Sequence, residues 1–413
     1  MQKWRFNLYV VWFSQILSML GFGLCIPFLP FYIQHLGVND PDQIKWLTGL
    51  LNAGPSLAMG LMAPVWGTLS DKYGRKPMIL RAILAGSIML PLMGITGNVG
   101  LLIVLRVLQG LFTGTVTAAS TLIAASTPND KLSYSLGFLS SSTFIGYTAG
   151  PALGGIIADS IGFQPTFFIG GSLMLVNLFL VFFFVKDVHD VSVDTPKRVD
   201  PPEESLSVSS SATVLSRIIV LLLIVLFFIR ISRSVFSPFL PLFVQDARGT
   251  LEGSTRITGY ISGLAGLFTA LSGITLCKLG DRMPKIKLMQ YLLFAGVIAS
   301  IPLMFLRNLW FFALSYSLMM FVVGSIEPLT MSLTSEMTEA GKRGRLFGIQ
   351  TMVGSLGWSI SPFLGSFVSI HYSYGVLLSL IPLFTLIAFI FLFLLKRNRG
   401  KANQQNNLDF YKF

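Results

Sequence analysis

The sequence predicts an all-α integral membrane protein, with twelve transmembrane helices in two pseudo-symmetric six-helix bundles and both termini in the cytoplasm. Three observations predict this fold class: an apolar composition, a series of long apolar runs, and an internal repeat. Of the 413 residues, 53% are hydrophobic and only 12% are charged. A soluble protein has about 25% charged residues, so the composition excludes a soluble enzyme and a disordered chain.

Twelve long apolar runs predict the individual crossings. A helix needs about 20 apolar residues to cross a bilayer, whereas barrel strands of about 10 residues would give shorter runs. The first run is too long for a cleavable signal peptide, and no small-residue cleavage site follows it. In chain order, the predicted helices have their cores at 8–34, 46–69, 79–96, 99–125, 134–158, 166–185, 217–245, 256–279, 287–306, 309–335, 346–369 and 375–395.

A polar stretch divides these helices into six plus six. Residues 186–216 predict a cytoplasmic linker without a fold of its own, because this stretch has little apolar content. The linker separates an N-terminal bundle at 1–185 from a C-terminal bundle at 217–395, and a cytoplasmic tail follows at 396–413.

The internal repeat supports this division, because an ordered series of residues recurs at an offset of 210 or 211 positions. Two parallel repeats of this kind are related by an axis along the membrane normal, and a site is expected between them near the bilayer midplane. The matched pairs are Pro27 and Pro238, Pro30 and Pro241, Thr48 and Thr258, Asp71 and Asp281, Gly114 and Gly324, Gly146 and Gly357, Pro151 and Pro362, and Gly154 and Gly365.

Lysine and arginine predict the orientation of the chain. With a cytoplasmic N-terminus, 23 of the 30 fall in inner loops and tails, four fall in outer loops, and Arg106, Arg230 and Arg233 fall inside helices. This positive-inside asymmetry predicts that both termini are cytoplasmic. It also accounts for the net charge of +12 without a nucleic-acid partner.

A loop rich in glycine and basic residues follows the second predicted helix. Glycines permit close helix approach, and Asp71 can pair with basic groups and with a helix N-terminus, so we expect a latch between the halves at the cytoplasmic face. The residues of the loop are Gly67, Asp71, Lys72, Gly74, Arg75 and Lys76, and a degenerate copy in the second half contains Asp281 and Arg282. The loop resembles the signature loop of the major facilitator superfamily, which implies the major facilitator fold.

The fifth predicted helix carries another glycine motif. Glycines four residues apart give a smooth face for close packing, and the proline among them bends the helix, so the segment is a candidate gate. The motif resembles the antiporter signature of drug-exporting members of the same superfamily. In the second half, Ser361 stands at the position equivalent to Gly150, so the complete motif lies in the first half only. Its residues are Gly146, Gly150, Pro151, Gly154 and Gly155.

Two further stretches resemble patterns of the twelve-helix drug:proton antiporters. One is the run from Gly21 to Pro30 in the first helix, and the other contains Arg106, Gln109 and Gly110 in the fourth helix. The second resemblance implies that Arg106 takes part in proton coupling. Together the resemblances cover the first half of the chain and, through the repeat, most of the second.

Glu327 is the one acid among the 18 that falls inside a predicted helix. A carboxylate in the hydrocarbon region is costly to insert and is therefore a functional candidate. Its proton affinity changes with burial and with nearby charge, so we predict that it loads and releases a proton, with a structural ion pair as the alternative. By depth, Arg230 is a better partner for it than Arg233. Some drug exporters have an acid in the seventh helix, where this chain has these two arginines. The positive charges of the arginines would repel a cationic drug.

By the repeat, helices one, four, seven and ten should border the substrate cavity, with contributions from helices five and eleven. An apolar cavity with few charges suits bulky amphiphiles better than sugars. The candidate lining residues are Phe28, Gln109, Thr113, Phe144, Phe236, Met320 and Trp358.

The resemblances imply a proton-coupled exporter of hydrophobic or amphiphilic compounds, a multidrug efflux antiporter of the bacterial inner membrane. Two alternatives are a transporter of a defined metabolite, such as a sugar or siderophore, and a sensor or assembly factor that moves no solute. The sequence lacks a Walker-type phosphate loop, so we expect a proton gradient to supply the energy.

The expected partners are small hydrophobic or amphiphilic solutes, protons and the lipid bilayer, and we expect a monomer that binds no nucleic acid. We expect no enzymatic activity and no cofactor. Cys25 and Cys277 lie far apart in the sequence, and there are only three histidines. This pattern predicts no disulfide framework and no metal site.

Overall fold

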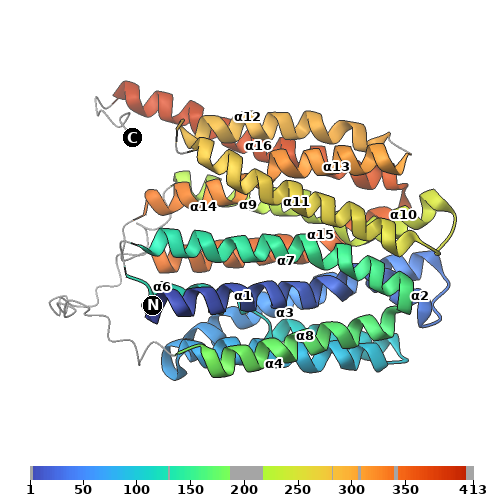
Figure 1. Ribbon diagram of the computed structural model, residues 1–413. Helices are drawn as coiled ribbons and strands as arrows, with labels where there is room; N and C mark the ends of the chain where they lie inside the picture. Colours follow the sequence, from blue (N-terminus) through green and yellow to red (C-terminus); the bar gives the residue numbers. More distant parts are fainter. Residues whose placement is uncertain are drawn as a thin grey trace. The chain divides into compact units, whose positions relative to one another are not determined.

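The computed structural model describes residues 3–128, 131–186, 217–280, 282–305, 308–338 and 343–405. Within these ranges the chain consists of helices joined by short connections and holds no strand (Figure 1). The predicted linker, apart from Lys186, and the end of the predicted tail lie outside the described residues.

The chain divides into two compact units. Unit 1 comprises Met1–Asn39, Leu57–Ser210 and Thr250–Gly263, and unit 2 comprises Asp40–Ser56, Ser211–Gly249 and Leu264–Phe413. Each unit therefore includes a helix end from the other half of the sequence. The predicted bundle boundary at the linker stays a prediction.

Unit 1 contains the helices that precede the linker and the beginning of one later helix. They are α1 (Lys3–Cys25), α2 (Leu29–His35), the second half of α3 (Pro41–Tyr73), α4 (Arg75–Ile95), α5 (Val99–Phe112), α6 (Thr115–Ser126), α7 (Leu132–Ile161), α8 (Phe163–Phe184) and the first residues of α11 (Ser254–Gly280).

Unit 2 contains the helices that follow the linker and the beginning of α3. They are α9 (Arg217–Ser234), α10 (Leu240–Arg248), most of α11, α12 (Lys285–Ser300), α13 (Leu309–Gly324), α14 (Ile326–Glu336), α15 (Arg343–His371) and α16 (Tyr374–Gln405).

Four predicted helices are interrupted in the structure. The first and seventh each break at a proline pair, where short 3-10 turns, Ile26–Phe28 and Ser237–Phe239, separate α1 from α2 and α9 from α10. Proline lacks an N–H and clashes with the preceding turn, so it ends a helix at these points.

The fourth and tenth predicted helices break at the matched glycines. Gly114 has φ +123°, a conformation that favours glycine, and it separates α5 from α6. Gly324 ends α13, and α14 begins at Ile326 after a single residue, Ser325. Glu327, which the sequence places near the middle of a continuous helix, therefore lies in the first turn of a separate helix.

Among the described residues, ten helical stretches are long and apolar enough to cross a membrane. The two other predicted crossings, 46–69 and 134–158, coincide with α3 and α7, whose 33 and 30 residues are not among these ten. Both helices carry many Gly, Ser, Thr and Pro residues, which lower their mean hydropathy. The twelve-helix count and the cytoplasmic position of the termini stay predictions.

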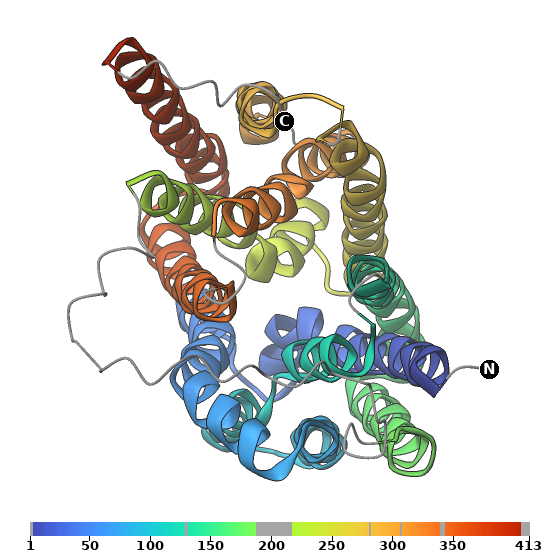
Figure 2. The ribbon, with the colours of Figure 1, turned by 90° about the vertical axis from the view of Figure 1, so that its left-hand side faces the viewer.

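The packing of each unit follows the repeat. In unit 1, α1 packs against α7 and α8, and α4 packs against α8. In unit 2, α9 lies between α15 and α16, as Figure 2 shows, and α12 packs against α16. Buried polar bonds fix these contacts: Asn177 Nδ2 donates to Ser18 Oγ at 2.8 Å in unit 1, and Ser232 and Thr385 hydroxyls are 2.8 Å apart in unit 2.

Candidate functional site

The charged site of unit 2 is built from α9 and α14. Glu327 contacts two arginines of α9: its Oε1 accepts a hydrogen bond from Arg230 Nη2, and its Oε2 lies 3.4 Å from Arg233 Nη1. The arginines are three residues apart and so lie on the same face of α9. The break before α14 places Glu327 at a helix N-terminus, where backbone N–H groups favour a carboxylate.

α15 holds Arg230 from the other side. The Arg230 guanidinium carbon lies 4.1 Å from the centroid of the Trp358 ring, a cation–π contact. A Cβ on Gly354 would lie 2.8 Å from that carbon, so the space for the guanidinium depends on the glycine. The arginine is thus clamped between an indole ring and a carboxylate, within one unit.

The four predicted proton-coupling residues are divided between the two units. Arg106, on α5 of unit 1, is 5% exposed and donates to Gln109 of the same helix. Glu327 and the arginines of α9 belong to unit 2. Within unit 2 the structure brings together three of the four predicted residues, and the fourth, Arg106, belongs to unit 1.

The glycines of the candidate gate lie against α1. A Cβ on Gly150 would lie 2.8 Å from Gly23 Cα, and one on Gly154 would lie 2.6 Å from Leu24 Cα. Gly146 faces Ile16 and Met19 in the same way, and Pro151 lies inside α7. Three of the glycines therefore let two backbones approach closely, as their spacing predicts.

The fourth glycine of this motif faces a different helix. A Cβ on Gly155 would lie 3.0 Å from Gly259 Cα, on the first turns of α11. The same end of α7 carries Asp159, which pairs with Arg256 at 2.9 Å and accepts a hydrogen bond from the Gly253 N–H at 3.1 Å. The sequence reasoning did not find this contact, because α7 and α11 are far apart in the chain.

The basic residues of the signature loop bind helix carbonyls of unit 1. Arg75 Nη1 donates to Thr121 O at 3.0 Å, and Lys76 Nζ donates to Phe182 O at 2.8 Å near the end of α8. Gly74 has φ +94° and forms the turn between α3 and α4.

The other members of the predicted latch are placed less fully. Gly67 is exposed on α3, and Lys72 lies 5.3 Å from the Tyr73 ring. Arg282 follows the end of α11, where its N–H donates to Leu279 O. Asp281 and the side chain of Asp71 lie outside the described residues, so the predicted latch between the halves stays a prediction.

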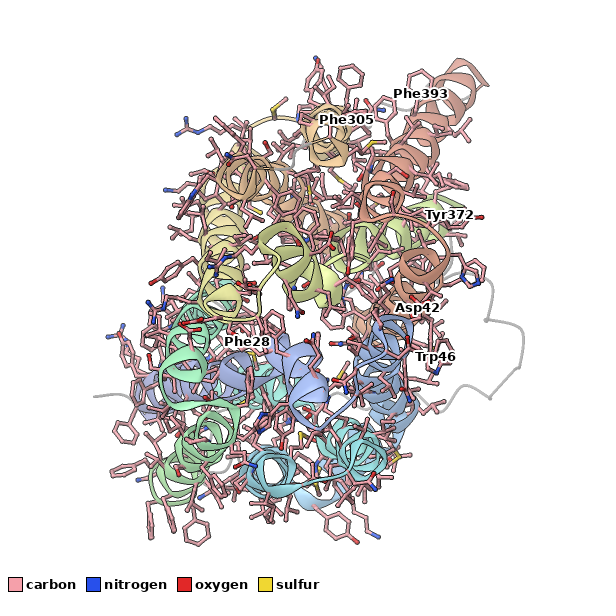
Figure 3. The ribbon with its side chains drawn as sticks, turned by 90° about the vertical axis from the view of Figure 1, so that its right-hand side faces the viewer. Phe28, Asp42, Trp46, Phe305, Tyr372 and Phe393 are labelled. Carbon is pink, nitrogen blue, oxygen red and sulfur yellow. The ribbon has the colours of Figure 1, made fainter. Side chains whose placement is uncertain are left out.

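The candidate cavity residues occupy several environments. Phe28 (Figure 3) and Gln109 are buried in unit 1, where Thr113 and Phe144 are half-buried. In unit 2, Phe236 packs in an aromatic cluster with Phe243, Phe312 and Tyr316, and Met320 is buried nearby on α13. Trp358 is 38% exposed beside Arg230.

Several contacting residues around Arg230 were not predicted. Ser234 and Ser361 hydroxyls are 2.6 Å apart, and Ser234 also donates to Arg230 O at 2.6 Å. These two serines stand 211 residues after Gly23 and Gly150, so the repeat in the sequence could have predicted that they lie against each other. In unit 1, Arg81 of α4 makes a similar contact that was not predicted: its guanidinium carbon lies 3.5 Å from the Trp66 ring centroid.

Comparison with known proteins decides the family. The sequence profile of the Major Facilitator Superfamily matches residues 11–307 and, in a second match, 222–410. The chain belongs to the major facilitator superfamily. It is therefore a multi-pass transporter of the cell membrane, and the predicted all-α membrane fold of this superfamily is confirmed.

A curated relative covers nearly the whole chain. Multidrug resistance protein MdtG of Proteus mirabilis (strain HI4320) is 31% identical over 372 residues, which are 90% of this chain and 91% of that protein. The same protein of Salmonella paratyphi B matches at the same identity and coverage.

Solved structures share the fold at lower identity. A bacterial homologue of the human lysosomal transporter Spinster, in an inward-facing and occupied conformation, superposes with a TM-score of 0.75 at 15% identity, covering 96% of this chain and 97% of the other. A point mutant of the nucleoside transporter NupG gives 0.74 at 11% identity, covering 94% and 99%. At these identities the likeness concerns the fold alone.

Proposed function

We propose that this chain is a proton-coupled exporter of hydrophobic or amphiphilic compounds, an antiporter of the multidrug efflux type that works by alternating access. Superfamily membership and the printed name of the 31% identical relatives support the cargo class. The contact of Glu327 with Arg230 and Arg233 carries the proposal of proton coupling.

The chemistry of this cluster supports reversible protonation. An ionised Glu327 is stabilised by two guanidinium groups and by the start of α14, whereas a protonated Glu327 loses most of both interactions. Any movement that separates α14 from α9 would therefore favour proton uptake, and a return to contact would favour release. Alternating exposure of such a group couples its proton to the transport cycle.

The glycine contacts between α7 and α1 support a helix interface that can move. Where Gly150 meets Gly23, neither residue has a side chain, so a small shift of one helix against the other meets little steric resistance at this point. Pro151 lies beside this contact and weakens the hydrogen bonding of α7. An interface of this kind suits a gate better than an interface with interlocked side chains does.

The test is dye accumulation in inside-out vesicles with an acidified lumen. The dye is lipophilic, fluorescent and uncharged, and vesicles with wild type are compared with vesicles containing Glu327→Gln. Glu336→Gln is the matched control, because Glu336 lies on the same helix, is largely exposed and pairs with Lys285. We expect wild type and control to accumulate dye until the gradient is collapsed, and Glu327→Gln to accumulate none above empty vesicles.

Each outcome separates the alternatives. No accumulation by wild type would contradict the drug-export proposal and favour a defined metabolite as cargo. Normal accumulation by Glu327→Gln would leave export standing but remove Glu327 from proton coupling. If neither this dye nor any solute moves and Glu327→Gln has no phenotype, a role without transport is favoured.

A further inference from the structure

The cluster on α9 and α14 has one more positive charge than negative charge when Glu327 is ionised. Arg230 and Arg233 bring two guanidinium groups, and Glu327 is the acid that contacts them within the described part of the chain. Glu336, the other acid of α14, pairs with Lys285 of α12 and lies about 13 Å along the helix from Glu327. An excess charge in a membrane-spanning segment is unfavourable unless a counter-ion joins it.

The other groups packed around the cluster do not supply that counter-ion. Tyr316 of α13 lies near Arg233, but a phenol is neutral at physiological pH. α15 contributes Trp358 and Ser361, which are uncharged. Among the described residues that face the cluster, Glu327 is thus the one source of negative charge.

The two arginines also keep donors for a further ligand. Glu327 binds Nη2 of Arg230 and Nη1 of Arg233, and the buried Nε atoms of both arginines have no hydrogen-bond partner in the structure. The indole ring of Trp358 covers a face of the Arg230 guanidinium, whose N–H groups point outward in its plane.

The cluster is not sealed by its neighbours. The side chain of Arg233 is 24% exposed and that of Glu327 is 20% exposed. Trp358, which stacks on Arg230, is 38% exposed to solvent. A ligand with an acid group and an aromatic or aliphatic body would therefore meet guanidinium donors beside an accessible indole surface.

We propose that Arg230 and Arg233 bind the acid group of a singly charged amphiphilic anion, and that a proton on Glu327 strengthens this binding. The anion neutralises the excess charge of the ionised cluster. A proton on Glu327 removes the carboxylate that competes for the same guanidinium groups, so the anion then binds two unopposed positive charges. By reciprocity, a bound anion favours proton uptake by Glu327.

This linkage adds an anionic ligand class to the uncharged cargo of the proposed antiporter. It rests on that proposal only for the route by which solutes reach the site. A cation would compete with the proton for Glu327, as an antiporter needs. An anion would instead load together with the proton. Whether a solute competes with the proton at this cluster or binds together with it therefore depends on the charge of the solute.

The test measures equilibrium binding of two fluorescent probes to the full chain in nanodiscs, with empty nanodiscs subtracted. Anilinonaphthalene sulfonate and phenylnaphthylamine share one ring system, and only the first carries a sulfonate. We expect wild type to bind the sulfonate about tenfold more tightly than the neutral probe at low pH, because charge-assisted hydrogen bonds contribute to that probe alone. This preference should weaken as pH rises and Glu327 ionises.

Variants locate the effect. We expect Arg233→Gln to lose most of the sulfonate preference while keeping the affinity for the neutral probe, which also reports that the variant is folded. Glu327→Gln should bind the sulfonate at least as tightly as wild type at low pH, and its affinity should not change with pH. In weak buffer, wild type should take up protons on binding the sulfonate, and Glu327→Gln should take up none.

Two results would overturn the proposal. One is an unchanged sulfonate preference in Arg233→Gln, and the other is sulfonate binding that weakens as the pH falls. Either result leaves export of an uncharged dye unaffected, so this site can fail while the proposed function stands. Conversely, sulfonate binding with the expected pH dependence in a chain that transports no dye would uphold the site and contradict the exporter.

Discussion

The contact of α1 with α7 in unit 1 and the contact of α9 with α15 in unit 2 use the same positions of the repeat with different chemistry. In unit 1, Gly150 lies against Gly23, and a Cβ on Gly146 would lie 3.2 Å from Met19 Cα. At the equivalent places, 211 residues later, unit 2 has the bonded serines Ser361 and Ser234.

The counterpart of Met19 in the repeat is Arg230. A Cβ added to Gly357 would lie 3.1 Å from the Cβ of Arg230. At these positions of the repeat, the contact in unit 1 is formed by glycines and a methionine, whereas the contact in unit 2 carries an arginine and two hydroxyls. The small residues preserve a close helix approach in both units, and only unit 2 uses that approach to hold a charge.

The largest expected effect comes from giving unit 2 the side chain of unit 1 at this place. Arg230→Met would leave Glu327 with the longer 3.4 Å contact to Arg233. The charge-assisted hydrogen bond of Arg230 and its stacking on Trp358 are lost, which together cost about 3 kcal/mol. We expect a large fall in the thermal unfolding temperature of the purified protein.

The matched control for this prediction is Lys285→Met, which breaks the more exposed pair with Glu336. Exposed ion pairs contribute less than about 1 kcal/mol, so its unfolding temperature should stay near that of wild type. Equal effects of the two substitutions would show that the contacts of Arg230 contribute no more to stability than an exposed ion pair does.

The next effect tests whether the close approach is common to both units. A Cβ on Gly154 would lie 2.6 Å from Leu24 Cα, and one on Gly365 would lie 2.5 Å from Val235 O. Gly154→Ala and Gly365→Ala should each lower the stability by about 1–3 kcal/mol, because the backbones must separate. Chemical unfolding of the purified variants measures this loss.

Gly137→Ala is the control for the glycine variants, since Gly137 lies on α7 with no atom within 4 Å of the added Cβ. Its stability should be unchanged or slightly raised, because alanine favours a helix more than glycine does. A loss in Gly154→Ala without one in Gly365→Ala would show that the repeat preserves the residue type but not the helix contact.

The smallest effect concerns the serine pair. Ser361→Gly restores the residue type of unit 1, and Ser234 keeps its hydrogen bond to Arg230 O. One neutral hydrogen bond is lost, so we expect a destabilisation of about 1 kcal/mol. The reverse substitution, Gly150→Ser, should be worse, because its Cβ would lie 2.8 Å from Gly23 Cα. Equal losses would contradict the asymmetry between the two contacts.

Much of the fold followed from local patterns in the sequence. Apolar runs predicted the positions of the long helices, because burial in a bilayer requires them whatever the neighbours are. Helix interruptions were harder to predict. Pro27 and Gly114 were visible in the sequence, but a proline or glycine in a membrane helix can bend it or break it, and neighbouring helices decide which.

The sequence by itself determined the membrane class, the repeat, the family motifs and the isolation of Glu327 among the acids. Those features depend on composition and order along one chain. The tertiary structure alone decided that Glu327 begins a helix, that both arginines of α9 reach it, and that Trp358 stacks on Arg230. It also decided that Gly155 faces α11 while its neighbours face α1. Such contacts depend on the rotation and separation of helices that are distant in the sequence, which local periodicity does not specify.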